Sequence, residues 1–466
     1  MNKERAIRIE ALQQRALTLL LAGLLVVAVV PLTSIPTATA QDGRMSLLLD
    51  AEVDDYVNGL AEPLFKAAGL SPENVHVLVL NSPQINAFVN SQRSLFMMSG
   101  LLLEAETANE VTGVIAHEIG HLKGHHLLRL NQAQSSLTLS SLVSGLIGIG
   151  AIAAGAPQAG SAVLVGGQAA GISSLLKFSR SQEQQADQIA VNLLKEENMS
   201  AEGLQSFFAR LGVQSQMYHK TPPEYLLTHP KPAGRENFLA QNVTTTYTPS
   251  PAEKTAFRRM QAKVLALTHT PAQTRRRLFE EDDGFADYAR AVAFIRAGQF
   301  DEAQQSLEHA VQKLGLTDDP YVDALYGHIA LENGNTEKAQ NLFETALNKS
   351  PQSTLLRYQY GRTLLMNNQH QNAIAQLERV LNHHEQWWMA HQQIGIAYGK
   401  VGQPVAAHIH LAQASLYQGN HKDADFHLQV ALKKLSERET AKPETNSAEQ
   451  AQTINLLQRE LEKLRN

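Results

Sequence analysis

The C-terminal part of this 466-residue chain carries a repeat with a period close to 34 residues, and this repeat constrains the fold more than any other feature. Alanines recur at spacings of 36, 34 and 34 residues, and a small residue recurs twelve positions before each of them. The two series are Ala303, Ala339, Ala373 and Ala407, and Ala291, Gly327, Gly361 and Gly395. Small residues at fixed positions let two helices approach closely, so the period predicts stacked helix pairs that form an α-solenoid.

This register resembles the tetratricopeptide repeat, and the resemblance covers residues 284–435. The motif GNHKDA brings Ala424 only half a repeat after the last full unit, which predicts a capping helix. A linker is expected over residues 276–283, before the array. Residues 436–466 are expected to be a polar tail with a short amphipathic helix that carries Leu456, Leu457, Leu461 and Leu464. An ordinary helical bundle is the alternative to the array.

The N-terminus has the three parts of a secretory signal. Four basic residues lie within the first fifteen, an apolar run extends from Leu17 to Val30, and small residues follow up to Ala40. This order predicts a cleavable signal peptide over residues 1–40 and hence export, and an exported chain without cysteine suits a bacterial periplasm. An uncleaved anchor is the alternative, because residues 16–41 hold no charge and are long enough to span a bilayer.

The composition excludes several kinds of site and partner. The chain has no cysteine, so disulfides, thiolate metal sites and a thiol nucleophile are excluded, and any metal site must use His, Asp or Glu. The net charge is −5, with 40 basic and 45 acidic residues. Because nucleic-acid binding leaves a clustered basic surface, we expect no nucleic-acid partner.

Residues 41–275 are predicted to form an α+β domain with a small sheet, so that the chain as a whole is mainly α. Apolar spacing predicts a helix within residues 47–69, and β-branched or aromatic runs predict strands near 75–80, 85–89 and 94–99. Two helices with charged faces are expected to follow, over residues 102–130 and 179–197.

The sequence AHEIGH contains the pattern H-E-x-x-H, formed by His117, Glu118 and His121. Two imidazoles at i and i+4 lie on one face of a helix, so both can reach one zinc ion, with Glu118 beside the water that the metal activates. The metzincin pattern would place a third histidine at position 127, but this residue is leucine. We interpret the neighbouring His125 and His126 as exposed or substrate-facing.

A better third ligand is Glu183 in the second polar helix, where Asp187 lies on the same face at i+4. Two histidines and one glutamate leave a fourth position open, as a catalytic zinc site requires. Asp187 can then accept a hydrogen bond from the other ring nitrogen of a ligating histidine and fix its tautomer. The alternative is that SQEQQADQ is an ordinary solvated helical face.

The segment from Leu130 to Leu176 contains no charged residue and is rich in Gly, Ala and Ser. Such a segment is not typical of a solvated loop. It is expected either to be buried as a helical hairpin that covers the active site, or to touch a membrane surface; insertion into the bilayer is a third option.

Three blocks in order, AHEIGH, SRSQEQQAD and THPKPAGR, resemble the membrane-associated zinc endopeptidases related to HtpX and to the CAAX prenyl proteases. With a signal and a repeat array, the chain resembles in particular the β-barrel assembly-enhancing proteases, and this resemblance implies the periplasm of a Gram-negative bacterium as its location. The resemblance implies a zincin metallopeptidase domain that binds one Zn2+ per chain through His117, His121 and Glu183, with Glu118 as general base. It also implies that a strand over 94–98 pairs with an extended substrate. The residues of that strand are Ser94, Leu95, Phe96, Met97 and Met98.

His229, in the block THPKP, has two interpretations under this resemblance. It can occupy the fourth zinc position and hold the enzyme inactive, or it can donate a hydrogen bond to the tetrahedral intermediate. A surface histidine between two prolines is the alternative to both. Arg235 matches the arginine that follows the motif in this family, but the sequence does not indicate its role.

The resemblance implies a metalloendopeptidase with chaperone-like activity that degrades misassembled outer-membrane β-barrel proteins. Its expected partners are such unfolded clients, the β-barrel assembly machinery (BamA) and LptD, with possible contact to a membrane surface. The alternative is mainly an adaptor or chaperone, in which the repeats act and the protease domain is normally self-inhibited.

Overall fold

The computed structural model describes residues 46–71, 75–90, 94–126, 169–217, 224–229, 234–243, 245–382, 384–441 and 447–465. All of these ranges belong to one compact unit that starts at Gln41. The predicted signal peptide, residues 1–40, lies outside the described residues. Residues 130–168 of the uncharged segment also lie outside them. Within the described part of the chain, no helix is long and apolar enough to cross a membrane.

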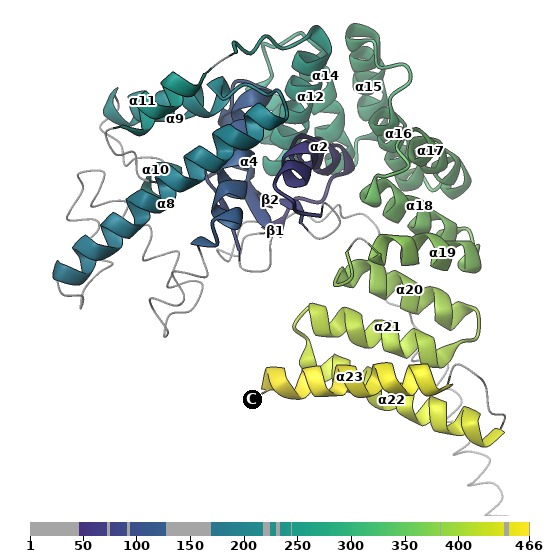
Figure 1. The fold of residues 1–466 in the computed structure, drawn as a ribbon. Helices are drawn as coiled ribbons and strands as arrows, with labels where there is room; N and C mark the ends of the chain where they lie inside the picture. Colours follow the sequence, from purple (N-terminus) through teal and green to yellow (C-terminus); the bar gives the residue numbers. More distant parts are fainter. Residues whose placement is uncertain are drawn as a thin grey trace, which may run out of the picture. The chain divides into compact units, whose positions relative to one another are not determined.

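The described strands form one four-stranded sheet in the order β1-β2-β4-β3. Figure 1 labels β1 and β2 of this sheet. The strands are β1 (Ser46–Leu47), β2 (Val77–Asn81), β3 (Ala87–Val89) and β4 (Leu95–Met98). β4 runs parallel to β2 and antiparallel to β3, so both of its edges are hydrogen-bonded. The three predicted strands are therefore present, but the prediction that residues 94–98 pair with substrate is wrong, because β4 has no free edge. Among the described strands, the edge strand on this side is β3.

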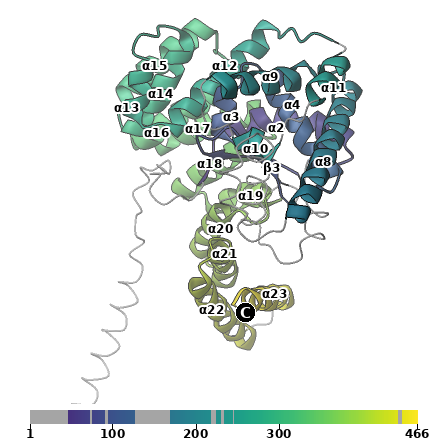
Figure 2. The same ribbon diagram turned by 90° about the vertical axis from the view of Figure 1, so that its left-hand side faces the viewer.

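Nine described helices accompany the sheet in the N-terminal half (Figures 1 and 2). They are α2 (Ala51–Ala67), α3 (Ser99–Glu104), α4 (Ala108–Lys123), α8 (Ala169–Glu196), α9 (Glu202–Met217), α10 (Glu224–Thr228), α11 (Arg235–Asn242), α12 (Pro251–Thr268) and α13 (Pro271–Arg277). The central helix is α4, which packs against α8 and α9. A Cβ at Gly120 would lie 2.5 Å from the Ala186 carbonyl oxygen, and a Cβ at Gly113 would lie 2.5 Å from the Leu204 nitrogen. Glycines in α4 thus allow α8 and α9 to approach its backbone.

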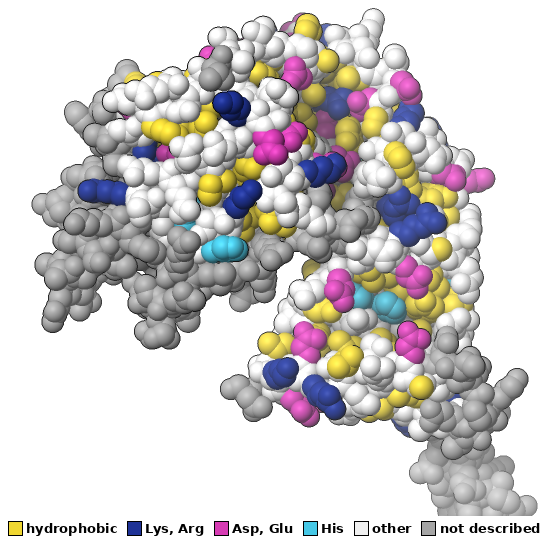
Figure 3. All heavy atoms as spheres, viewed as in Figure 1, with side chains coloured by type: hydrophobic (Ala, Val, Ile, Leu, Met, Phe, Trp, Pro, Cys, Tyr) yellow, Lys and Arg dark blue, Asp and Glu magenta, His cyan; other side chains and the backbone are white. Residues whose placement is uncertain are grey.

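The predicted repeat array is confirmed as a series of antiparallel helix pairs. Its helices are α14 (Gly284–Ala297), α15 (Phe300–Leu314), α16 (Pro320–Glu332), α17 (Thr336–Lys349), α18 (Thr354–Met366), α19 (His370–Leu381), α20 (Trp388–Lys400) and α21 (Pro404–Tyr417). Ala303, Ala339 and Ala373 are completely buried between paired helices. On the face that Figure 3 shows, hydrophobic side chains lie between acidic and basic ones over the repeats.

Two longer helices follow, α22 (His421–Ala441) and α23 (Ser447–Arg465). The predicted C-terminal helix is present, but it is 19 residues long and packs against α21 and α22. Leu457 and Leu461 are buried in this contact together with Ile454, whereas Leu456 and Leu464 are exposed. The last helix is therefore part of the hydrophobic core at the end of the array and not an isolated tail.

The repeats contact the N-terminal half through α2, α12 and α13. A cavity of about 610 Å³ lies between α2 and the repeats, with Asp54 and Asp55 on one wall and Tyr321 and His384 on the other. Asp55 accepts a hydrogen bond from the Tyr321 hydroxyl at 3.0 Å. Burial, and then the charges of Asp55 and Asp50, raise the pKa of Asp54 to about 7.

We predict that the stability contributed by Asp54 falls as the pH rises. An acid whose pKa is raised on folding contributes stability below its unfolded value, here 3.8, and loses it as the pH rises through the folded value of about 7. Asp54→Asn should therefore reduce the change in the urea unfolding midpoint between pH 5 and pH 8. An equal change in wild type and variant would contradict the assignment.

Candidate metal centre

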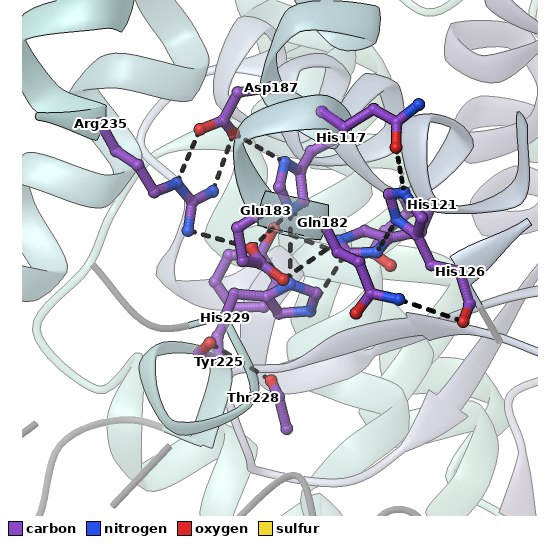
Figure 4. Close-up of polar contacts among 12 residues, drawn as sticks. His117, His121, His126, Gln182, Glu183, Asp187, Tyr225, Thr228, His229 and Arg235 are labelled. Atoms are coloured by element: carbon purple, nitrogen blue, oxygen red, sulfur yellow. Dashed lines mark hydrogen bonds and ion pairs between the residues drawn. The ribbon is translucent and has the colours of Figure 1, made fainter. Parts of the chain in front are cut away.

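Helix α4 carries the H-E-x-x-H motif into the interior of the protein. Its first turn is capped by Thr107, whose side chain accepts a hydrogen bond from the Glu110 nitrogen. His117 is 0% exposed and Glu118 is 1% exposed. The Nε2 atoms of His117 and His121 lie 3.1 Å apart, so the two imidazoles converge as the spacing predicts (Figure 4).

Helix α8 brings the predicted carboxylates to these imidazoles. Glu183 Oε2 lies 3.3 Å from His117 Nε2, and Glu183 Oε1 lies 3.4 Å from His121 Nε2. Burial alone would raise the pKa of Glu183, but His229, His121 and Arg235 together hold it well below its usual range. The carboxylate is therefore ionised and available as a ligand.

His229 comes from a different element, directly after α10, and also points into this cluster (Figure 4). Its Nδ1 atom lies 3.2 Å from His117 Nε2 and 3.3 Å from Glu183 Oε2. Its backbone nitrogen donates to the Tyr225 carbonyl, and the Tyr225 nitrogen donates to the Ile85 carbonyl. The short helix thus docks on the segment between β2 and β3 and holds His229 over α4.

These four side chains fit a metal ion. His117, His121, Glu183 and His229 are buried and offer one ligand atom each within 4.8 Å of one another. The donor-to-donor distances given above run from 3.1 to 3.4 Å. A tetrahedral ion with metal–ligand bonds of about 2.0–2.1 Å separates its ligand atoms by about 3.3–3.4 Å. Three imidazoles and one carboxylate are also among the ligands that zinc prefers in proteins.

Asp187 and Arg235 support the cluster from the side of His117 that faces away from the converging donor atoms. Asp187 Oδ1 lies 2.9 Å from His117 Nδ1, the contact that the i+4 spacing predicts. Arg235 donates to both carboxylate oxygens of Asp187, at 2.6 and 2.8 Å, and its Nη1 lies 3.0 Å from Glu183 Oε2. Its guanidinium also lies over the Phe208 ring. Arg235 therefore fixes two carboxylates at once, a role that no sequence pattern indicated.

Glu118 does not belong to the four converging donors, but it lies beside them. Its Oε1 atom is 3.3 Å from His229 Nε2, and the Tyr225 hydroxyl donates to it at 3.5 Å. Burial raises the pKa of Glu118 to about 7, although His121 and His117 oppose this shift. Tyr225 lies in a helix of only five residues, so hydrophobic periodicity could not identify it.

The structure separates His125 and His126, for both of which the sequence predicts an exposed or substrate-facing position. His125 is exposed, but His126 is only 2% exposed. His126 Nδ1 lies 3.0 Å from His121 Nδ1, so His126 contacts the motif histidine from the side opposite its metal-facing nitrogen. The reason is a turn at the end of α4, where His125 adopts a positive φ of 51° and reverses the chain.

Comparisons with known proteins agree with this geometry. Residues 49–243 match peptidase family M48, and residues 330–394 match a tetratricopeptide repeat. The chain is 29% identical over 271 residues to the beta-barrel assembly-enhancing protease of Yersinia pestis, which covers 56% of this chain and 55% of that protein. It is 28% identical over 275 residues to the protein of the same name from Escherichia coli (strain K12), with 57% and 56% covered.

A more distant relative is a mitochondrial enzyme. The Bos taurus metalloendopeptidase OMA1 is 29% identical over 181 residues, which cover 37% of this chain and 33% of that protein. The matches to the two bacterial proteases span little more than half of their length.

Proposed function

We propose that this chain, which carries a peptidase family M48 domain followed by tetratricopeptide repeats, is a zinc-dependent endopeptidase of the periplasm. One observation carries this proposal: four buried metal-binding side chains converge, and a further carboxylate, that of Glu118, lies beside them without being one of the four donors. His117, His121 and Glu183 would hold the ion. A zinc ion bound there supplies Lewis acidity to the scissile carbonyl and to the attacking water.

Glu118 is the proposed general base. Its pKa of about 7 lets it accept a proton near neutral pH and return it to the leaving amine. The Tyr225 hydroxyl, which donates to Glu118, orients the carboxylate toward the cluster. Asp187 holds His117 in place and Arg235 holds Glu183 in place. Both supporting residues are buried, and two hydrogen bonds join them to each other.

The extended substrate has a place at the edge of the sheet. No described strand pairs with the outer edge of β3, and β3 packs against α4, which carries the motif. We therefore assign substrate pairing to β3 and not to β4.

The position of His229 supports the interpretation that it inhibits the enzyme, rather than the one in which it stabilises the tetrahedral intermediate. A fourth protein ligand closes the coordination of zinc, whereas catalysis needs an open position. His229 reaches that fourth position with Nδ1 and contacts Glu118 with Nε2 at 3.3 Å, so one side chain blocks both the metal and the base. We infer that the enzyme is inactive until His229 leaves the cluster.

We predict that His229→Ala raises the rate of peptide cleavage. If about nine-tenths of the wild-type molecules are in the closed state, opening the site in all of them raises the cleavage rate about tenfold. A larger closed fraction in wild type would give a larger increase. The measurement is the initial rate on an unfolded protein substrate, with zinc content determined on the same samples. A lower rate would instead favour a role for His229 in stabilising the tetrahedral intermediate.

The proposed substrates are misassembled outer-membrane β-barrel proteins, with the β-barrel assembly machinery (BamA) and LptD as partners. The names of the two bacterial relatives, the predicted export signal and the repeats support this assignment. The predicted contact of the uncharged segment with a membrane surface remains part of the proposal. An adaptor role is less well supported, because the relatives are named as proteases.

Metal analysis of the purified full chain tests the proposal. We expect about one zinc ion per chain, loss of cleavage on chelation and recovery when zinc is restored. Wild-type and His229→Ala proteins that both contain zinc and both cleave no unfolded substrate would contradict it.

A further inference from the structure

We propose that His126 is a positioning residue that holds His121 in the tautomer able to bind the metal, through a hydrogen-bonded chain that begins at Gln185. This inference rests on the proposed metal site. It concerns the second of the two motif histidines, because the first already has Asp187 at its Nδ1. Figure 4 shows His126 beside His121.

The chain of contacts runs from α8 back to α4. Gln185 Oε1 lies 3.1 Å from His126 Nε2, and His126 Nδ1 lies 3.0 Å from His121 Nδ1. The Gln182 amide also donates to the His126 carbonyl at 3.3 Å, which fixes the backbone of His126. Helix α8 therefore holds His126 at both its ring and its main chain.

The tautomers of His126 and His121 follow from the acceptor with which this series of hydrogen bonds begins, the Gln185 side-chain oxygen. The Gln185 oxygen can only accept, so His126 Nε2 carries a proton and His126 Nδ1 keeps its lone pair. His126 Nδ1 then accepts from His121 Nδ1, which leaves the lone pair of His121 on Nε2. That nitrogen is the one that lies 3.1 Å from His117 Nε2 in the cluster.

The reverse direction is incompatible with a ligand role for His121. If the Gln185 amide donated to His126, then His126 Nδ1 would donate to His121 Nδ1. His121 would carry its proton on Nε2 and could not bind a metal through it. Only the direction in which His126 donates to Gln185 leaves a lone pair on His121 Nε2, the nitrogen that points into the cluster of four donors.

Gly124 makes the arrangement possible. A Cβ at this position would lie 2.3 Å from His126 Nε2 and 2.8 Å from two carbons of the same ring. The positive φ of 51° at His125 turns the chain so that the His126 ring folds back over the C-terminal end of α4. The sequence GHH after the motif is therefore a structural unit that supports His121.

The first test measures zinc affinity and not activity. In His126→Phe, a ring of similar size fills the same space but offers no nitrogen. We expect the zinc Kd of the full chain, from competition with a chelator of known affinity, to rise by about 10–100-fold. His125→Asn is the matched control, because His125 is the exposed neighbour and Asn tolerates its positive φ.

Two further readouts separate positioning from a loss of fold. The thermal midpoint of the metal-free protein shows whether His126→Phe still folds. Nitrogen-15 shifts of labelled histidines report the tautomer, and His121 should carry its proton on Nδ1 in metal-free wild type and lose this preference in the variant. Unchanged zinc affinity in a folded variant would overturn the inference, whereas wild type that binds no zinc would overturn the proposed metal site itself.

Gly124→Ala gives an independent test that removes no histidine. The new Cβ should displace the His126 ring and raise the zinc Kd as much as His126→Ala does. Because both changes act on one contact, the double variant should be no worse than His126→Ala alone. If the losses of zinc affinity in Gly124→Ala and His126→Ala add up in the double variant, Gly124 does not act through the position of the His126 ring.

Discussion

Replacing Glu118 with glutamine should lower the rate of peptide cleavage by about 10²–10⁴-fold while leaving the zinc content unchanged. Glutamine has nearly the same shape, and it can still accept the hydrogen bond from the Tyr225 hydroxyl. It cannot take a proton from the attacking water. Because Glu118 is not one of the four converging donors, the metal should remain bound.

The rate is best measured in the His229→Ala background, where the site is expected to be open and the starting activity is high. Glu110→Gln is the matched control, since it makes the same change at a buried carboxylate of the same helix. Glu110 is paired with Arg210 at 2.6 Å, so this control should lower thermal stability but not the rate at low temperature. An active Glu118→Gln enzyme would exclude Glu118 as the base.

The sequence predicts those parts of the site that depend on spacing within one helix. His117 and His121 are one turn apart in α4, and Glu183 and Asp187 are one turn apart in α8, so helical periodicity alone places each pair on one face. The repeats are predictable for the same reason, because their buried alanines recur at a fixed period.

The remaining features depend on how distant segments meet. The order of the sheet places β4 between β2 and β3, and no pattern within residues 94–98 distinguishes an inner strand from an edge strand. The burial of His126 depends on the left-handed residue that precedes it, and this residue is a histidine rather than a glycine. Propensity therefore gives no signal of the turn, and the sequence predicts His126 to be exposed or substrate-facing.

The contact between the N-terminal half and the repeats contains a buried ionic cluster, and breaking it should strongly destabilise the protein. Glu52 of α2 is 3% exposed and accepts hydrogen bonds from Arg259 Nε and from the Tyr288 hydroxyl, both at 2.5 Å. Arg259 also donates to Asp319, directly before α16, at 2.5 Å. Residues of α2, α12 and the first two repeats thus meet around the Arg259 guanidinium, which also lies over the Tyr288 ring.

We predict that Glu52→Gln costs about 3–5 kcal/mol, because it leaves the positive charges of Arg259 and Lys263 buried without their main partner. The measurement is the urea unfolding midpoint at pH 7. Glu62→Gln is the matched control on the same helix, since Glu62 pairs with Lys66 in solvent, with side-chain exposures of 52% and 61%. Removing an exposed pair should cost less than about 1 kcal/mol.

The pH dependence of this effect has a defined sign. Burial alone would raise the pKa of Glu52, but Arg259 and Lys263 outweigh it and lower the pKa below 4.5. A carboxylate with a lowered pKa contributes stability above its unfolded value and loses it as the pH falls through its folded value. The difference between wild type and Glu52→Gln should therefore be largest near neutral pH and shrink below about pH 4.5. A constant difference from pH 7 to pH 3 would mean that Glu52 acts through packing and not through its charge.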